Sequence, residues 1–419
     1  MSRISRALVV AAVLAAPLLP ASASASEVES RPCPQLRLAD HWYGDNAAKI
    51  QRVIDERGRC GTGGRPLAVF DWDNTVIKND ISDQTIFWML RHDKVLQPQA
   101  RDWRSTSRFI TDAGADALAA ACGTAVPAGA PLPTSRNFAC ADEILSVRKS
   151  GKTTSGEEVF AGYNHRYMEA GYAWVAQLNA GYRPAEVRAI ARAARDEALR
   201  APVGATQRVG SGTEVAWVRY YPEIKDLIAT LNRAGFSTWV VSASPKETAD
   251  VWSAEVGIPP SRTIGINSLT SHGRINGHLE GCGGLPDGAD AIMPYIDGKR
   301  CFINKKILGI EGAAQLDAAP EAQRQALAGG DATTDVTMLR DATGVRVTLN
   351  RNKDELMCRA YDNADGRWAV NPMFIQPLPA LNRAYPCATN AYENADGSTG
   401  PVLRDDGTVI PDQRDTVHG

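Results

Sequence analysis

Short apolar runs alternate with amphipathic segments over most of the chain. Such runs predict buried parallel strands, whereas apolar positions three or four residues apart predict helices between them. The predicted strands cover residues 67–70, 236–241, 263–267, 325–330 and 345–349, and helices are expected at 46–57 and 222–231. This alternation is typical of an α/β fold with a doubly wound, Rossmann-like parallel sheet.

One long segment with a helical pattern separates the first predicted strand from the second. Within it we expect helices at 82–91, 156–180 and 184–201 and a loop at 122–135. Farther along the chain, Asn276-Gly277 predicts a hairpin turn within residues 274–278.

The first 25 residues have the pattern of a cleavable Sec-type signal peptide. Arg3 and Arg6 precede an apolar stretch at 7–19 and small residues at 21–25. That stretch is shorter than the about 20 residues that a membrane-spanning helix needs. The two arginines are not adjacent, so a twin-arginine signal is not supported. We therefore expect a secreted or extracytoplasmic protein without a membrane span.

The remaining composition narrows the possible partners. Eight cysteines in an exported chain predict disulfides, and no Cys-x-x-Cys occurs that would favour zinc. Eight cysteines permit about 105 connectivities. We expect neighbours along the chain to pair: Cys33 with Cys60, Cys122 with Cys140, Cys282 with Cys301, and Cys358 with Cys387. A formal net charge of -2 without a basic block argues against a nucleic-acid partner.

Two carboxylates directly follow the first predicted strand. Asp71 and Asp73 are spaced one residue apart, so in extended chain their side chains point the same way. A cation could draw both toward one centre and leave one carboxylate free to attack an electrophile. The alternative is a solvated corner between a strand and a loop.

Three later stretches favour the catalytic interpretation. Ser242 follows a run of Val and Trp, Lys299 follows Asp297-Gly298, and Gly330-Asp331-Ala332-Thr333-Thr334-Asp335 ends the fourth predicted strand. Together with Asp71-Trp72-Asp73-Asn74-Thr75, these stretches resemble, in order, the four motifs of haloacid dehalogenase-like phosphatases. Within that superfamily the chain looks like the phosphoserine-phosphatase-like branch. It is most similar to secreted phosphorylcholine phosphatases at residues 70–75, 172–177, 242–243 and 298–299.

This resemblance implies a role for each motif residue. Asp71 would be the nucleophile that forms an aspartyl-phosphate, and Asp73 the general acid and base. Mg²⁺ would be bound by Asp71, the backbone carbonyl of Asp73, and Asp331. Ser242 and Lys299 would hold phosphoryl oxygens.

Three of these assignments have alternatives. Ser242 could cap the helix that follows it. Asp335 could orient the metal ligands without contacting the metal, or could serve as a charge at a helix N-terminus. Lys305 and Lys306 compete with Lys299 as the phosphate-binding lysine.

The resemblance also implies a domain organisation. Residues 67–78 and 212–350 would form the catalytic core, and residues 79–211 a large, mainly helical cap inserted after the first strand. Residues 26–66 would be an N-terminal extension. Residues 351–419 would form a strap tied by a disulfide, with fraying expected at 400–419.

Aromatic residues gather in one part of the predicted cap. Tyr163, Tyr167 and Trp174 could bind a quaternary ammonium group through cation–π contacts, or could form the apolar core of the cap. We therefore expect an exported Mg²⁺-dependent phosphomonoesterase that hydrolyses a small organic phosphate such as phosphorylcholine. The alternatives are a broad-specificity secreted phosphatase and a catalytically silent phosphate-binding homologue. The oligomeric state stays open.

Overall fold

The computed structural model describes residues 8, 32–61 and 64–417. Residues Met1–Pro32 and Cys33–Gly419 are separate units, and all elements below belong to the second. The predicted signal peptide lies outside the described residues except for residue 8.

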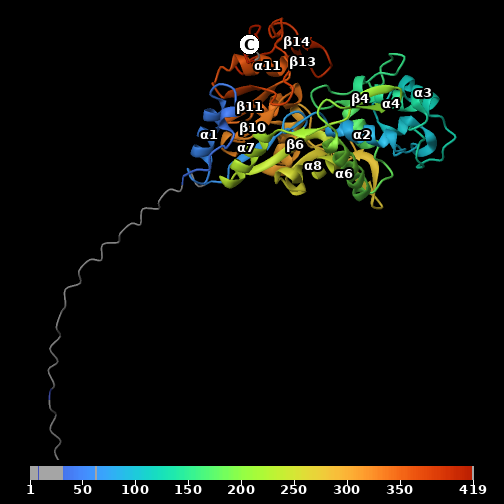
Figure 1. The fold of residues 1–419 in the computed structure, drawn as a ribbon, viewed down its shortest axis with the longest axis horizontal. Coiled ribbons are helices and arrows are strands. Elements are labelled where there is room, and N and C mark those ends of the chain that lie inside the picture. Colours follow the sequence, from blue (N-terminus) through green and yellow to red (C-terminus); the bar gives the residue numbers. More distant parts are fainter. Residues whose placement is uncertain (1–7, 9–31, 62–63, 418–419) are drawn as a thin grey trace, which may run out of the picture. The chain divides into compact units, whose positions relative to one another are not determined.

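A parallel sheet of six strands forms the centre of the fold (Figure 1). The strands are β1 (Leu67–Phe70), β6 (Ser237–Pro245), β7 (Thr263–Ile266), β10 (Leu327–Gly330), β11 (Val345–Asn350) and β12 (Trp368–Pro372). Their spatial order is β12-β11-β10-β1-β6-β7. From β1 the chain proceeds to β6 and β7 on one side and then returns to β10 on the other side. The order of strands therefore reverses between β1 and β10, and the predicted doubly wound sheet is confirmed.

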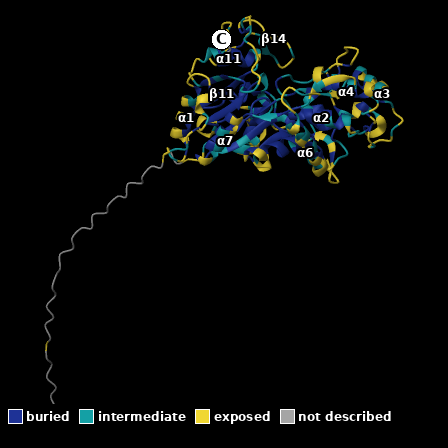
Figure 2. Cartoon of the chain, in the orientation of Figure 1, coloured by how far each residue is buried: buried dark blue, intermediate teal, exposed yellow. Residues whose placement is uncertain are grey.

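Helices cover both faces of the sheet. They are α1 (Asn46–Arg57), α7 (Pro222–Arg233), α8 (Lys246–Ser253), α9 (Asp297–Ile303), α10 (Val336–Arg340) and α11 (Asp354–Asp362). Alternate residues of β1 point to opposite faces: Ala68 and Phe70 pack in one cluster with α1, α7 and α8, and Leu67 and Val69 pack in another with α9, α10 and α11. Figure 2 shows these strands buried beneath exposed helix surfaces.

Most of the segment between β1 and β6 forms a mainly helical cap, whose apolar residues cluster together with Ile266, Leu279 and Met293 of the core. Its elements are α2 (Ile81–Arg91), α3 (Asp112–Cys122), α4 (Phe138–Ser150), α5 (Ala170–Gln177), α6 (Pro184–Arg200) and the hairpin of β3 (Thr206–Val209) with β4 (Gly212–Val215). The chain enters and leaves the cap through a short antiparallel ribbon, β2 (Ile77–Lys78) with β5 (Arg219–Tyr220). Arg166 also ties the cap to the core, because its guanidinium donates to Asp297 and Glu355.

The predicted helix at 156–180 is wrong for its first half. Only α5 is helical there, whereas Gly156 and Gly162 have φ values of 95° and 77°. These left-handed conformations interrupt a helix. Sequence periodicity also missed α3 and α4. The predicted loop at 122–135 is free of helix and strand from residue 123 on.

The predicted hairpin exists with a different turn. β8 (Ser268–Ser271) pairs with β9 (Arg274–Leu279), and the turn is at His272-Gly273. Asn276-Gly277 instead lies inside β9, where the register shifts between the two strands and Gly277 has a φ of 84°. The Asn-Gly pair therefore accommodates a bulge.

The C-terminal strap contributes to the core. It contains α11 and β12, and short strands β13 (Tyr392–Glu393) and β14 (Thr399–Gly400) pair beyond them. Fraying of residues 400–417 is not observed, because Ile410 donates a backbone hydrogen bond to Val402 and Tyr385 to Gln413.

Four disulfides join the neighbouring cysteines as predicted. They are consistent with an oxidising compartment. Among the residues that the structure describes, no helix is long and apolar enough to cross a membrane.

Candidate active site

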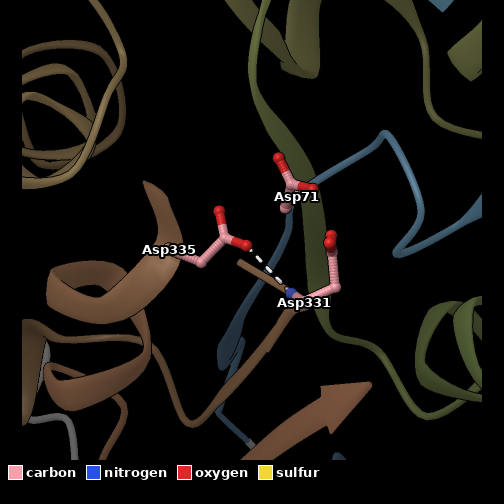
Figure 3. A group of neighbouring side chains, drawn as sticks. All are labelled: Asp71, Asp331 and Asp335. Carbon is pink, nitrogen blue, oxygen red and sulfur yellow. Dashed lines mark hydrogen bonds between the residues drawn. The ribbon is translucent and has the colours of Figure 1, made fainter. Parts of the chain in front are cut away.

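Three carboxylates converge where the strand order reverses. Asp71 follows β1 and Asp331 follows β10, the neighbouring parallel strand, so both lie at the carboxyl edge of the sheet. Asp335 lies four residues beyond Asp331 and turns back toward it (Figure 3). One carboxylate oxygen from each of the three lies within 4.8 Å of the others. This edge is where open α/β sheets bind their ligands.

Buried donors hold these carboxylates in place. The Lys299 ammonium, itself fully buried, lies 2.6 Å from Oδ1 of both Asp71 and Asp335. The Thr75 hydroxyl lies 3.0 Å from Oδ2 of Asp71 and 2.6 Å from Oδ1 of Asp331, and its single hydrogen can serve one of them at a time. Arg351 donates from Nη1 to Oδ2 of Asp331 at 2.6 Å.

Two glycines permit this packing. Gly330 ends β10, and a Cβ there would lie 2.6 Å from the Cβ of Asp335. With glycine, Asp335 approaches closely enough for its Oδ2 to accept from the backbone N–H groups of Asp331 and Ala332. Gly298 precedes Lys299, and a Cβ there would collide with the carbonyl oxygen of Met293. Glycine at these positions thus lets the acidic loop and the lysine pack against their neighbours.

The carboxylates exceed the cations that they contact. Burial raises the pKa of Asp71 well above its usual value, and the Asp335 charge raises it further against the opposing effect of Lys299. Burial likewise raises the pKa of Asp331, whereas Arg351 lowers it. Carboxylate oxygens are the ligands that Mg²⁺ prefers, and an added divalent cation would relieve this repulsion. Asp71 and Asp331 therefore offer oxygen ligands that fit such an ion, and Asp335 lies next to them.

Asp73 stands apart from that group and has its own hydrogen bonds. Its Oδ1 accepts from the backbone N–H of Ile81, and its Oδ2 from the Ser244 hydroxyl, both at 2.7 Å. Ser82 of α2 in turn donates to the Ser244 oxygen at 2.7 Å. Burial, then the charges of Asp80 and Asp71, raise the pKa of Asp73 well above its usual value. Burial and these two charges favour a carboxyl group that retains a proton, as a general acid requires, whereas the hydrogen bonds from Ile81 and Ser244 act in the opposite direction.

A cavity of about 450 Å³ opens above these residues and extends to the cap. Arg148 of α4 lies 3.0 Å from Asp83 of α2 and stacks over the Tyr172 ring at 4.4 Å. Lys149 contacts both carboxylate oxygens of Glu214 at 2.8 Å. Burial raises the pKa of Asp83 to about 6 despite the nearby Arg148. The cap thus adds paired charges and an aromatic ring to the cavity wall.

The predicted phosphate-binding residues, three candidate lysines and Ser242, lie in different surroundings. Lys299 contacts Asp71, whereas Lys305 and Lys306 both pair with Glu280. Ser242 is fully buried and does not line the cavity, and its oxygen accepts from the backbone N–H of Ser244.

The three predicted substrate aromatics do not line this cavity. Trp174 is fully buried in the cap cluster, where its Nε1 donates to Thr106. Tyr163 stacks on His165, and Tyr167 packs against the core cluster that contains α9. The aromatic residues on the cavity wall are instead Phe87 and Tyr172.

Sequence reasoning gave no role to three contacts of the site. Thr75 belongs to the first motif, and Ser244 lies two residues beyond Ser242 on the same strand, so both could have been suggested by alternation. Arg351 follows β11 directly, and the rule that ligands bind at carboxyl ends of strands is the signal that could have found it.

Comparisons with family models and with curated proteins give no match. Among solved structures, a conserved functionally unknown protein from Anaerococcus prevotii is 17% identical, with a TM-score of 0.54 over 79% of this chain and 95% of that chain. A protein of unknown function from Bordetella pertussis is 15% identical, with a TM-score of 0.43 over 74% and 99%. A substrate-bound phosphoserine phosphatase is 11% identical, with a TM-score of 0.30 over 68% and 86%. At these identities a likeness concerns the fold alone.

Proposed function

We propose that this chain, which has a haloacid dehalogenase-like fold, is an exported Mg²⁺-dependent phosphomonoesterase that acts on a small organic phosphate. The observation that carries the proposal is the environment of Asp71. This carboxylate lies at the point where the strand order reverses, 2.6 Å from the buried Lys299 ammonium, and lines a cavity that also contains Asp73.

In the first step Asp71 attacks phosphorus. Its carboxylate oxygen forms a bond to phosphorus while the bond to the leaving oxygen breaks, which gives an aspartyl-phosphate and an alcohol. Asp73 gives its proton to the leaving oxygen. The raised pKa of Asp73 supports this role, because the carboxyl group must be protonated before the step.

In the second step water hydrolyses the aspartyl-phosphate. Asp73, now a carboxylate, takes a proton from the attacking water, and the bond between phosphorus and the Asp71 oxygen breaks. Inorganic phosphate leaves and both aspartates return to their starting states. The hydrogen bonds from Ile81 and Ser244 hold Asp73 in one orientation for both transfers.

Lys299 and Ser242 would bind phosphoryl oxygens. The Lys299 ammonium already contacts Asp71, so it would offset negative charge as the dianion approaches. The Ser242 oxygen accepts one hydrogen bond, and no acceptor among the described residues takes its hydroxyl hydrogen, which supports donation to phosphate.

Asp71, Asp331 and the backbone carbonyl of Asp73 would hold Mg²⁺, with Asp335 orienting Asp331 through its backbone N–H. When bound, the ion supplies positive charge that stabilises the phosphoryl group during transfer.

Cap residues would bind the leaving group and so determine substrate specificity. The cavity combines the Tyr172 and Phe87 rings with the acidic residues Asp80 and Asp83. Similarity to secreted phosphorylcholine phosphatases makes phosphorylcholine the first substrate to test. Arg148 already covers the Tyr172 ring, so a quaternary ammonium group could stack there only after this guanidinium moved.

The experiment is phosphate release by the purified mature protein from an aryl phosphate, phosphorylcholine, phosphoserine and glycerol phosphate. We expect release with Mg²⁺, loss with EDTA and recovery when Mg²⁺ is restored. A chain that binds inorganic phosphate and releases none from any of these esters would be the silent homologue. Equal specificity constants for all esters would indicate a broad-specificity phosphatase.

A further inference from the structure

We infer that Arg351 is a second cationic phosphate-binding residue, which Asp331 holds in place when no phosphate is bound. This inference rests on the proposed function and adds a residue outside the four motifs. Arg351 directly follows β11, next to the strand that carries Asp331. It therefore reaches the carboxyl edge of the sheet from the side opposite to β6.

The contacts of the guanidinium leave most of its donors available. Nη1 lies 2.6 Å from Oδ2 of Asp331, and among the described residues this is the one hydrogen bond that Arg351 donates. A guanidinium carries five N–H donors in a planar fork that matches two oxygens of a phosphate. The side chain is 28% exposed and lines the same cavity as Asp71. Unused donors thus belong to a residue that lines the same cavity as the proposed nucleophile.

The balance of charges in the site indicates why an additional cationic donor would help to bind phosphate. Asp71, Asp331 and Asp335 are three carboxylates, whereas Lys299 and Arg351 are the two cations that contact them. A phosphate dianion that entered such a site would meet net repulsion from the protein. Mg²⁺ would offset part of this repulsion. The Arg351 guanidinium would offset a further part and could also donate hydrogen bonds to the phosphate.

The inference makes opposite predictions for the two ligands. Arg351 attracts phosphate, but it also contacts a carboxylate that would bind Mg²⁺ and repels that ion. Replacement by a neutral side chain should therefore weaken phosphate binding and strengthen Mg²⁺ binding. A residue that merely oriented Asp331 would weaken both when it is replaced.

The experiment measures binding of Mg²⁺ alone, and of inorganic phosphate at saturating Mg²⁺, by titration calorimetry on the full mature chain. For Arg351→Met we expect about a tenfold to hundredfold loss of phosphate affinity and a severalfold gain of Mg²⁺ affinity. Arg351→Lys keeps the charge without the fork and should recover part of the phosphate affinity. Arg404→Met is the matched control, because Arg404 forms a similar pair with Asp362 and does not line the cavity.

Two results would overturn the inference. One is phosphate affinity in Arg351→Met within twofold of the wild type, and the other is a parallel loss of Mg²⁺ and phosphate affinity. If Arg351→Met does not fold, an unchanged phosphate affinity in Arg351→Lys counts equally against the fork. Failure of the wild type to bind either probe would instead refute the proposed function, and the inference with it.

Discussion

Two groups of charged residues at the cavity differ in their balance of charge. In the crevice at the sheet edge, three carboxylates contact two cations: Asp71, Asp331 and Asp335 contact Lys299 and Arg351. On the cap, Arg148 pairs with Asp83 and Lys149 with Glu214. We call these groups the carboxylate crevice and the cap pairs. The crevice contains more carboxylates than cations, whereas each charge of the cap pairs has a partner of opposite sign. Metal-dependent chemistry is thus expected of the core, and leaving-group selection of the cap.

The largest effect should follow from removing the nucleophile. Asp71→Asn preserves the shape of the side chain but leaves an amide, which is a poor nucleophile and metal ligand, so we expect turnover to fall at least about a thousandfold. Initial rates of phosphate release measure the loss, and circular dichroism checks that the fold persists. Activity near that of the wild type would refute the assignment of Asp71.

Asp73→Asn should test the role of the general acid independently of the carboxylates that would bind Mg²⁺. Loss of the proton donor should slow hydrolysis of alkyl phosphates about 10² to 10⁴-fold. Aryl phosphates should lose less, because their leaving oxygen is stable without a proton. Specificity constants for both ester classes test this expectation. Equal losses for aryl and alkyl esters would count against the role.

Mg²⁺ should stabilise the crevice and leave the cap pairs unaffected. A ligand present at about a thousandfold over its dissociation constant adds about 4 kcal/mol to the free energy of unfolding. We expect this gain, read as a rise in Tm, in the wild type and in Asp83→Asn. Asp331→Asn should lose most of it. An equal gain in all three proteins would place the ion elsewhere.

The smallest effect concerns the pH dependence of the cap pairs. Burial raises the pKa of Asp83 to about 6, above the about 3.9 of an unfolded aspartate. The folded state therefore binds this proton more tightly, so the resulting stability is present at low pH and is lost as the pH rises toward about 6. Asp83→Asn should lack this dependence.

Denaturant unfolding from about pH 4 to pH 7 measures that difference. Because the Asp83 side chain is 31% exposed, we expect the difference between wild type and variant to change by about 1 to 2 kcal/mol over this range. Asp80, Lys149 and Glu214 also act on Asp83, so a constant difference would show that these neighbours already set its charge.

Local sequence patterns predicted five of the six strands of the central sheet and missed β12, which lies in the predicted strap. The apolar run before Asp71 and the run before Ser242 are short-range signals; the first ends where β1 ends, whereas β6 continues to Pro245. The doubly wound parallel sheet could therefore be predicted from the sequence. The neighbour pairing of cysteines also held, since each pair closes a short loop.

Tertiary contacts explain what the sequence did not predict. The segment with Tyr163 and Tyr167 carries helix-compatible residues, but glycines with left-handed conformations bend it out of helix. The residue type of Trp174 does not reveal whether its ring lines a cavity or lies in an apolar core. Tertiary packing determines this, and it places the ring in the core. Arg351 meets Asp331 across two strands, 20 residues apart in sequence, which no local pattern encodes.

The β2–β5 ribbon that connects the cap to the core affects how readily the cap can be replaced by another segment. Ile77 pairs with Tyr220 and Lys78 with Arg219, so the chain leaves and re-enters the core within one interstrand spacing, about 4.8 Å. Segments grafted onto such a ribbon leave the register of β1 and β6 untouched, and loop-closure entropy changes slowly with the length added. The Arg166 contacts would have to be rebuilt with each graft. We therefore expect that this cap segment can be exchanged while the carboxylates at the sheet edge keep their positions.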